Sequence, residues 1–216
     1  MIPLIPSFAK LAKIPSTFII FLMLMVLLLG SDVIYGAEFS GRMSTVLIIY
    51  ILLLVMARSE MPKKEHKSRT IFQSIPAFLI MFFITIFVMM GITPFAGEII
   101  AASTLEASLE FVAVFGLMHA FVKAYIEEEV FRSRLSTILG ELGQAIAFGA
   151  FHFFILLIVF GFSPMLVAAM GWLAVLGLLW GFIENRFGIE GSTGSHFAYN
   201  LAAFGMIPVI FGALVI

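Results

Sequence analysis

The sequence predicts an all-α protein, a polytopic bundle of about seven transmembrane helices that forms one domain over residues 1–216. The first observation is composition: 62% of the residues are hydrophobic, 12% are charged, and the mean hydropathy is +1.16. Soluble domains carry about twice that share of charge. The second observation is that the apolar runs are continuous. Alternating runs would indicate a barrel, the other structure that satisfies its backbone in lipid.

Seven apolar runs, separated by short polar breaks, are the predicted spans. Some of them are shorter than the roughly 20 residues that the hydrocarbon layer requires, so we expect their ends to extend into the flanking residues. In chain order the runs are Ser16–Leu29, Ser44–Ala57, Ile71–Gly91, Leu109–Ile126, Gly143–Phe160, Pro164–Ile183 and Ser195–Val215.

The distribution of lysine and arginine predicts the orientation. With the N-terminus in the cytoplasm, every basic residue except Arg42 lies on or near the cytoplasmic side, as the positive-inside rule requires. The charged loop Ala57–Arg69 is then an internal topology anchor, and Ile92–Ser108, which lacks basic residues, is an outer loop. The first run has no clear cleavage site near Ala37, so we interpret it as a span rather than a signal peptide. The expected location is the cell membrane.

Composition also excludes several classes of function. A net charge of −1 does not provide the basic surface that a nucleic-acid-binding protein needs. The chain has no cysteine, which rules out disulfides, thiolate metal sites and a cysteine nucleophile. No glycine-rich phosphate-binding pattern follows a strand, so nothing indicates ATP- or NAD-dependent chemistry. We therefore expect no cofactor.

Three polar clusters fall at the ends of spans or inside them, where ionisable groups are costly and commonly functional. Side chains four apart share a helix face, and each cluster contains such a pair. The pairs are Glu128 and Arg132, Phe148 and His152, and His196 and Asn200. With Glu127, a bundle that turned these faces inward would collect a carboxylate, two imidazoles and a carboxamide. This set suits hydrolysis, since it offers a base, a group that orients water and oxyanion donors.

Each cluster also has a simpler interpretation. The run from Glu127 to Glu129 fits a solvated helix end, His152 fits a buried core histidine, and His196 with Asn200 fits hydrogen bonding between helices. His119 and Lys123 share a face and are interpreted as bundle or interfacial residues. For the whole chain, two other functions stay open. One is a transporter or channel with an ion site of Glu and His, and the other is a zinc hydrolase, although the compact His-Glu-x-x-His signature is missing.

The order of the motifs resembles the CPBP family of intramembrane proteases, which includes the endopeptidase that trims prenylated CAAX proteins. The family pattern is Glu-Glu-x-x-x-Arg, then Phe-x-x-x-His, then His-x-x-x-Asn. A glycine-containing helix and a short Arg-x-Gly turn precede the last motif. The matching residues in this chain, within about Tyr125–Leu201, are Glu127, Glu128 and Arg132, Phe148 and His152, Gly177 and Gly181, Arg186 and Gly188, and His196 and Asn200. Two positions depart from the pattern: Ser133 stands where glycine is common, and Glu129 where an apolar residue is more usual.

The resemblance implies an intramembrane endopeptidase that uses no metal, with a catalytic core of about residues 109–216 and an active site toward the cytoplasm. Glu127 and His152 would activate a water molecule, and His196 and Asn200 would form the oxyanion hole. Supporting roles would fall to Glu128, Arg132 and Phe148. The expected partners are the lipid bilayer and a membrane-associated peptide or lipidated protein substrate.

Overall fold

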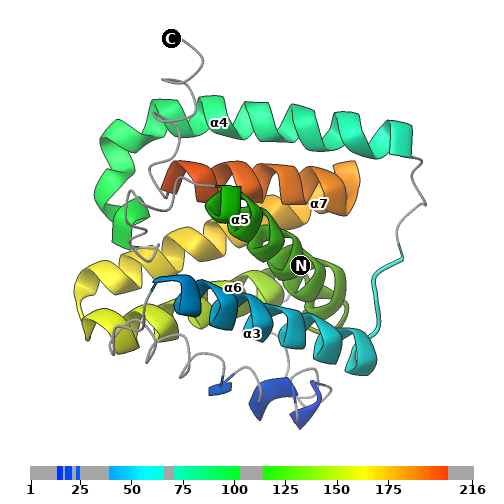
Figure 1. The fold of residues 1–216 in the computed structure, drawn as a ribbon, viewed down its shortest axis with the longest axis horizontal. Coiled ribbons are helices and arrows are strands. Elements are labelled where there is room, and N and C mark those ends of the chain that lie inside the picture. The colour runs from blue at the N-terminus through cyan, green and yellow to red at the C-terminus, as the bar shows by residue number, and fades with distance from the viewer. Residues whose placement is uncertain are drawn as a thin grey trace, which may run out of the picture.

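A computed structural model of the chain describes residues 14–16, 18–20, 23–24, 39–65, 71–102 and 114–203 (Figure 1). Every element of regular secondary structure in these ranges is a helix. In chain order they are α3 (Phe39–Glu60), α4 (Ile71–Ala102), α5 (Val114–Glu127), the π-helix η2 (Glu128–Leu135), α6 (Ser136–Phe160) and α7 (Pro164–Ala203). No residue in the described ranges lies in a strand. The all-α prediction is confirmed.

Three helical stretches are long and apolar enough to cross a membrane. They are Gln73–Gly91, Ala120–Leu157 and Pro164–Ala202. Large apolar side chains face outward along them: Phe87 is 68% exposed and Phe182 is 63% exposed. Exposed apolar surface of this kind is expected where hydrocarbon, rather than water, surrounds a protein. These features support an integral membrane protein.

Two glycines divide the long helices into segments. Gly140 (φ 75°, ψ 176°) interrupts α6, and Gly188 (φ 77°, ψ 176°) interrupts α7. This backbone region is accessible almost only to glycine. The first residues of α6 therefore continue from η2, and α7 consists of two helices, 164–187 and 189–203. The predicted Arg-x-Gly turn at Gly188 coincides with the second of these breaks.

Several predicted boundaries differ from the structure. The predicted span Leu109–Ile126, described from Val114 onward, does not stop at the glutamates, because α5 passes directly into η2. The predicted outer loop Ile92–Ser108 is helical as far as Ala102. The last helix begins six residues before the predicted Ser195–Val215 span. A prediction from hydropathy places the end of a helix where charged residues begin. Charged residues that pair with one another inside the protein do not have to leave the membrane, so the helix can continue through them. Most of Ser16–Leu29, and residues 204–216, lie outside the described residues.

Small residues bring the helices close together around the site. Gly194 of α7 lies against α4, so that a Cβ atom there would be 2.4 Å from the Phe78 carbonyl oxygen. Gly177 of α7 lies against α6, where a Cβ atom would be 3.1 Å from Cα of Ala145. Figure 1 shows α4 running alongside the last part of α7. Close contacts at small residues are typical of membrane helices.

Candidate functional site

The three consecutive glutamates lie where the helix changes form. Glu127 ends α5, and Glu128 and Glu129 begin η2, a π-helix in which every residue is buried. All three glutamate residues have an exposed fraction of 0%. The interpretation of this run as a solvated helix end is therefore wrong. Segments of π-helix are rare and are frequently found at functional sites.

Two histidines from different helices meet at the Glu127 carboxylate. Nε2 of His152, on α6, lies 3.7 Å from Oε1, and Nε2 of His196, on α7, lies 3.2 Å from Oε2. Both histidines are buried. The structure thus brings together three of the four catalytic residues that the sequence predicted, although up to 69 positions separate them in the chain.

A tyrosine and a lysine complete the surroundings of Glu127. The Tyr50 hydroxyl, from α3, donates a hydrogen bond to Oε1 of Glu127 at 2.5 Å. Nζ of Lys123 lies 3.8 Å from the same oxygen, one helical turn away on α5. Sequence reasoning missed Tyr50 and interpreted Lys123 as a bundle or interfacial residue. A signal for Tyr50 existed, because a tyrosine hydroxyl inside an apolar span needs a hydrogen-bond partner. The side chain of His119 lies outside the described residues.

The hydrogen bond at Nδ1 of His152 determines how its ring faces Glu127. Nδ1 lies 3.0 Å from the Phe148 carbonyl oxygen, which can only accept. Nδ1 therefore carries the proton, and in the neutral ring Nε2 presents a lone pair toward Glu127. The Phe148 ring lies 4.5 Å from the imidazole, centroid to centroid, and fixes its plane. The two residues share a helix face, as their spacing predicted.

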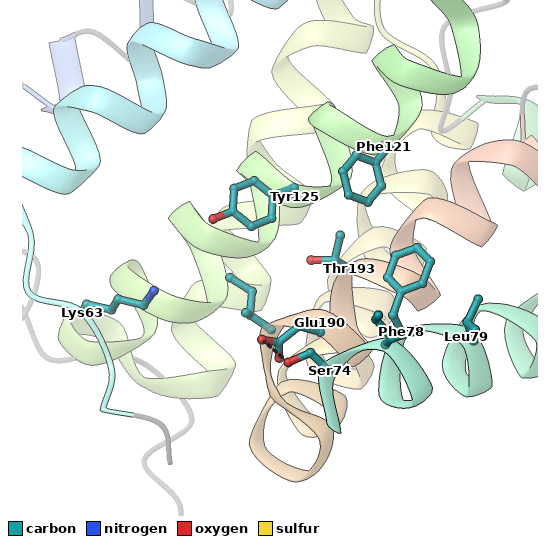
Figure 2. Close-up of a pocket in the computed structure, with 10 residues that line it drawn as sticks. Lys63, Ser74, Phe78, Leu79, Phe121, Tyr125, Glu190 and Thr193 are labelled. Atoms are coloured by element: carbon teal, nitrogen blue, oxygen red, sulfur yellow. Dashed lines mark hydrogen bonds between the residues drawn. The ribbon is translucent and has the colours of Figure 1, made fainter. Parts of the chain in front are cut away.

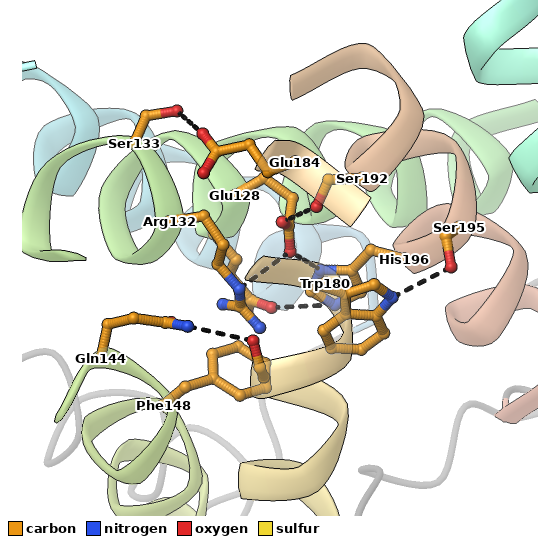
Figure 3. A network of polar contacts seen from close by, with 12 residues as sticks. Glu128, Arg132, Ser133, Gln144, Phe148, Trp180, Glu184, Ser192, Ser195 and His196 are labelled. Carbon is orange, nitrogen blue, oxygen red and sulfur yellow. Dashed lines mark hydrogen bonds and ion pairs between the residues drawn. The ribbon is translucent and has the colours of Figure 1, made fainter. Parts of the chain in front are cut away.

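His196 is held between two carboxylates. Its Nδ1 lies 2.7 Å from Oε1 of Glu128, while its Nε2 faces Glu127. The imidazole stacks on the Trp180 indole with ring centroids 3.8 Å apart and planes 13° apart. Figure 3 shows this arrangement, with Ser192 donating a hydrogen bond to the other oxygen of Glu128. Sequence reasoning missed Trp180 and Ser192, because no pattern in the sequence indicates that either residue contacts the site.

Arg132 is a fully buried cation that lies between aromatic rings. Its Nε is 3.5 Å from Oε1 of Glu128, which is the pair that the four-residue spacing predicted. The guanidinium carbon lies 4.0 Å from the Phe148 ring centroid and 5.2 Å from that of Trp180. Such cation–π contacts stabilise a desolvated charge. Arg132 therefore links Glu128 to the aromatic residues that orient both histidines.

Asn200 lies one turn beyond His196 on α7 and is buried. Its Nδ2 donates to the Ala120 carbonyl oxygen of α5 at 3.3 Å, rather than to another residue of the predicted site. This bond ties the middle of α5 to α7. The role of Asn200 as an oxyanion donor stays a prediction.

A second polar network ties the linker after α3 to η2. Arg134 donates to Glu129 at 3.1 Å and to the Met61 carbonyl oxygen at 2.7 Å. Nζ of Lys63 lies 3.2 Å from Glu129, and the backbone N–H of Lys64 donates to the Ser133 carbonyl oxygen at 2.7 Å. The basic linker and the glutamate run therefore lie at the same end of the bundle.

Comparison with known proteins provides no relative for this chain. No family model, no curated protein and no solved structure matches it. Within the described part of the chain, no group of three His, Cys, Asp or Glu side chains is arranged to hold a metal ion.

Proposed function

We propose that this chain is an intramembrane endopeptidase that uses a glutamate and no metal, and that it belongs to the CPBP family that its motifs resemble. The observation that carries the proposal is the convergence of His152 and His196 on the buried carboxylate of Glu127. Placing an ionisable side chain inside a helical membrane bundle costs free energy, and such side chains commonly have a functional role. This applies to a buried acid that faces two imidazoles.

The attacking group in this mechanism is a water molecule between Glu127 and His152. Oε1 of Glu127 and Nε2 of His152 are 3.7 Å apart, beyond the range of a direct hydrogen bond. Both atoms accept hydrogen bonds when the ring is neutral, so one water molecule can donate to each of them. Its remaining lone pairs then point away from both groups, toward a scissile carbonyl. Glu127 takes the proton as the water attacks and delivers it to the departing amine.

His196 and Asn200 stabilise the negative charge of the tetrahedral intermediate by donating hydrogen bonds to its oxyanion. Because Nδ1 of His196 donates to Glu128, its ring must carry both protons for Nε2 to donate to an oxyanion. Glu128 is therefore more than a partner of Arg132: it orients His196. Asn200 reaches an oxyanion by exchanging its bond to Ala120 for one to substrate, so its contribution is smaller than that of either histidine.

The surroundings support a substrate that reaches the site from the membrane and the cytoplasmic side. Arg58, Lys63 and Arg134 lie beside Glu129, and Lys64 lies beside Glu184, so basic residues gather at this end of the bundle, as the cytoplasmic end of a membrane protein would require. We place the N-terminus in the cytoplasm and the chain in the cell membrane, with about seven spans. The proposed substrates are membrane-anchored peptides or lipidated proteins.

The test is cleavage by purified protein in proteoliposomes. Membrane-anchored and lipidated peptides are supplied as a panel, and products are identified by mass spectrometry. Glu127→Gln and His152→Ala should each lower turnover by roughly a hundred- to ten-thousandfold, and Asn200→Ala by less. Glu65→Gln, which removes an exposed carboxylate outside the site, should leave turnover unchanged. Unchanged cleavage in Glu127→Gln would end the proposal.

Two further measurements separate the alternatives that the sequence left open. A metal chelator should leave cleavage intact; loss of activity that is restored by added zinc would instead indicate a zinc hydrolase. Ion or proton uptake by the same proteoliposomes should be absent. Uptake that disappears in Glu127→Gln, without peptide cleavage by the natural sequence, would indicate a transporter.

A further inference from the structure

A pocket of about 460 Å³ lies on the face of α5 away from Glu127, between α4, α5 and α7. Its walls are mostly apolar and include Ile75, Phe78, Leu79 and Phe121. Figure 2 shows Phe78, Leu79 and Phe121 with Thr193 near them and with Lys63 at one side. The volume lies within the range of sites that bind small molecules or side chains.

The pocket opens on an apolar outer surface of the bundle, with polar residues at one edge. Ile75, Leu79 and Phe121 are 53%, 44% and 40% exposed, and they belong to helices that present apolar surface outward. Ser74 and Glu190, which are hydrogen-bonded at 3.1 Å, form a polar edge. An occupant therefore enters sideways from the bilayer and meets polar groups at one edge.

The deepest wall carries a hydroxyl without a partner. Thr193 is 2% exposed, and its Oγ1 has no hydrogen bond among the described residues. An unpaired buried hydroxyl is costly, so such groups commonly have a ligand or water as partner. A hydrocarbon chain in the pocket would leave this hydroxyl unpaired. A peptide backbone would satisfy it, either through a carbonyl oxygen or through an N–H group.

Thr193 also links the pocket to the site. It follows Ser192, which bonds Glu128, and it precedes His196 by one helical turn. An extended peptide whose backbone bonds Thr193 would therefore run along the same part of α7 that carries His196. Phe197, next to His196, packs on two rings of the pocket wall, with centroids 5.6 Å from Phe121 and 6.4 Å from Phe78.

We infer that this pocket binds a large apolar side chain of the peptide substrate, with the adjacent backbone hydrogen-bonded to Oγ1 of Thr193. The inference rests on the proposed peptidase function and adds to it the basis of substrate selection. A substrate with phenylalanine or leucine at the pocket position is preferred over one with alanine, and this residue enters from the bilayer.

The first test measures KM and kcat for two versions of the reporter peptide that is cleaved in proteoliposomes. The two versions carry Phe or Ala at one position near the cleaved bond, and the comparison is repeated for each such position in turn. Thr193→Val keeps the shape and removes the hydroxyl, and it should raise KM roughly two- to tenfold with little change in kcat. Thr137→Val is the matched control, because the Thr137 hydroxyl bonds its own helix at the Arg134 carbonyl oxygen, outside the pocket.

Filling the pocket provides a second, independent variant. Leu79→Trp should abolish the preference for Phe over Ala, because the indole occupies the space that the substrate side chain would fill. An unchanged preference in Leu79→Trp, together with an unchanged KM in Thr193→Val, would overturn the inference while leaving the peptidase proposal standing. A lipid that copurifies with the natural sequence and is lost in Leu79→Trp, with no change in preference, would assign the pocket to an acyl chain and also overturn it.

Binding can be tested apart from cleavage. The Glu127→Gln protein is irradiated with a reporter that carries a photoreactive phenylalanine analogue in place of the preferred Phe. Crosslinks should map to the α4 and α5 walls, at Leu79 or Phe121. Crosslinks confined to other helices would contradict the pocket assignment. If the natural sequence cleaves no reporter at all, the peptidase proposal fails, and the crosslinks still report whether the pocket binds peptide.

Discussion

At the scale of single residues, the decisive contact is one between two acceptors. The carboxylate of Glu127 and the lone pair on Nε2 of His152 face each other across 3.7 Å, and neither donates to the other when the ring is neutral. Two desolvated acceptors in this position repel each other unless a donor lies between them. Tyr50, by contrast, supplies a donor directly to Glu127 from α3. Oε1 of Glu127 thus accepts a hydrogen bond from Tyr50 on one side, and in the proposed mechanism the reacting water donates to the same oxygen on the side of His152.

Removing the Tyr50 hydroxyl should therefore impair turnover more than substrate binding. Tyr50→Phe deletes a hydrogen bond to a charged group, and we expect kcat to fall roughly ten- to hundredfold with KM little changed. The measurement is steady-state cleavage of the reporter in proteoliposomes. Ser59→Ala is the matched control, because it removes an exposed hydroxyl from the same helix that bonds only the local Met56 carbonyl oxygen. A rise in KM alone would place Tyr50 in substrate binding instead.

At the scale of helices, the site depends on close packing that single residues permit. The π-helix η2 carries Glu128, Glu129 and Arg132 inward together. On the other side, α7 presents His196 only because its second helix lies directly against α4. Gly194 makes this approach possible, since any side chain there would meet the Phe78 backbone at 2.4 Å. The helix contact and the position of His196 are therefore coupled.

Gly194→Ala should separate α4 from α7 and lower stability. Overpacking of this kind costs about 1–3 kcal/mol, and His196, two residues away, should lose alignment with Glu127, so turnover should fall as well. Thermal unfolding in detergent and reporter cleavage measure the two effects. Gly171→Ala is the control on the same element: no atom lies within 4 Å of its Cβ position, and alanine favours the helix by about 1 kcal/mol. Equal stability of the two variants would contradict the close packing.

At the scale of the molecule, sequence reasoning succeeded where spacing along one helix carries the information. The pairs Glu128–Arg132 and Phe148–His152 are found in contact as predicted, because a helical turn brings them together regardless of tertiary structure. It failed for Tyr50 and Trp180, because nothing in a local pattern indicates which distant helix supplies a partner. It also failed at helix ends. The charged residues in 127–135 resembled the end of a helix, but they are paired inside the protein. The helices are interrupted instead at Gly140 and Gly188.

The orientation of the whole bundle can be tested because the chain contains no cysteine. The backbone bond from Lys64 to Ser133 places the linker 61–65 at the same end as η2. From there, the helix over 141–160 covers about 30 Å at 1.5 Å per residue, the thickness of the hydrocarbon layer. The linker and the turn 161–163 should therefore lie on opposite sides of the membrane, and from its basic residues we expect the linker on the cytoplasmic side.

Single cysteines at Glu65 and Ser163 should accordingly react with a membrane-impermeant maleimide from opposite sides. Glu65→Cys should be labelled only when the reagent reaches the cytoplasmic face of membrane vesicles, and Ser163→Cys only from the outer face. The unlabelled natural sequence serves as background, and retained reporter cleavage shows that each variant is folded. The reversed pattern would place Glu127 and the basic linker outside the cell, where substrates presented from the cytoplasm would not reach the site. Labelling of both cysteines from one face would mean that the helix over 141–160 does not span the bilayer, because its ends would then share one aqueous compartment.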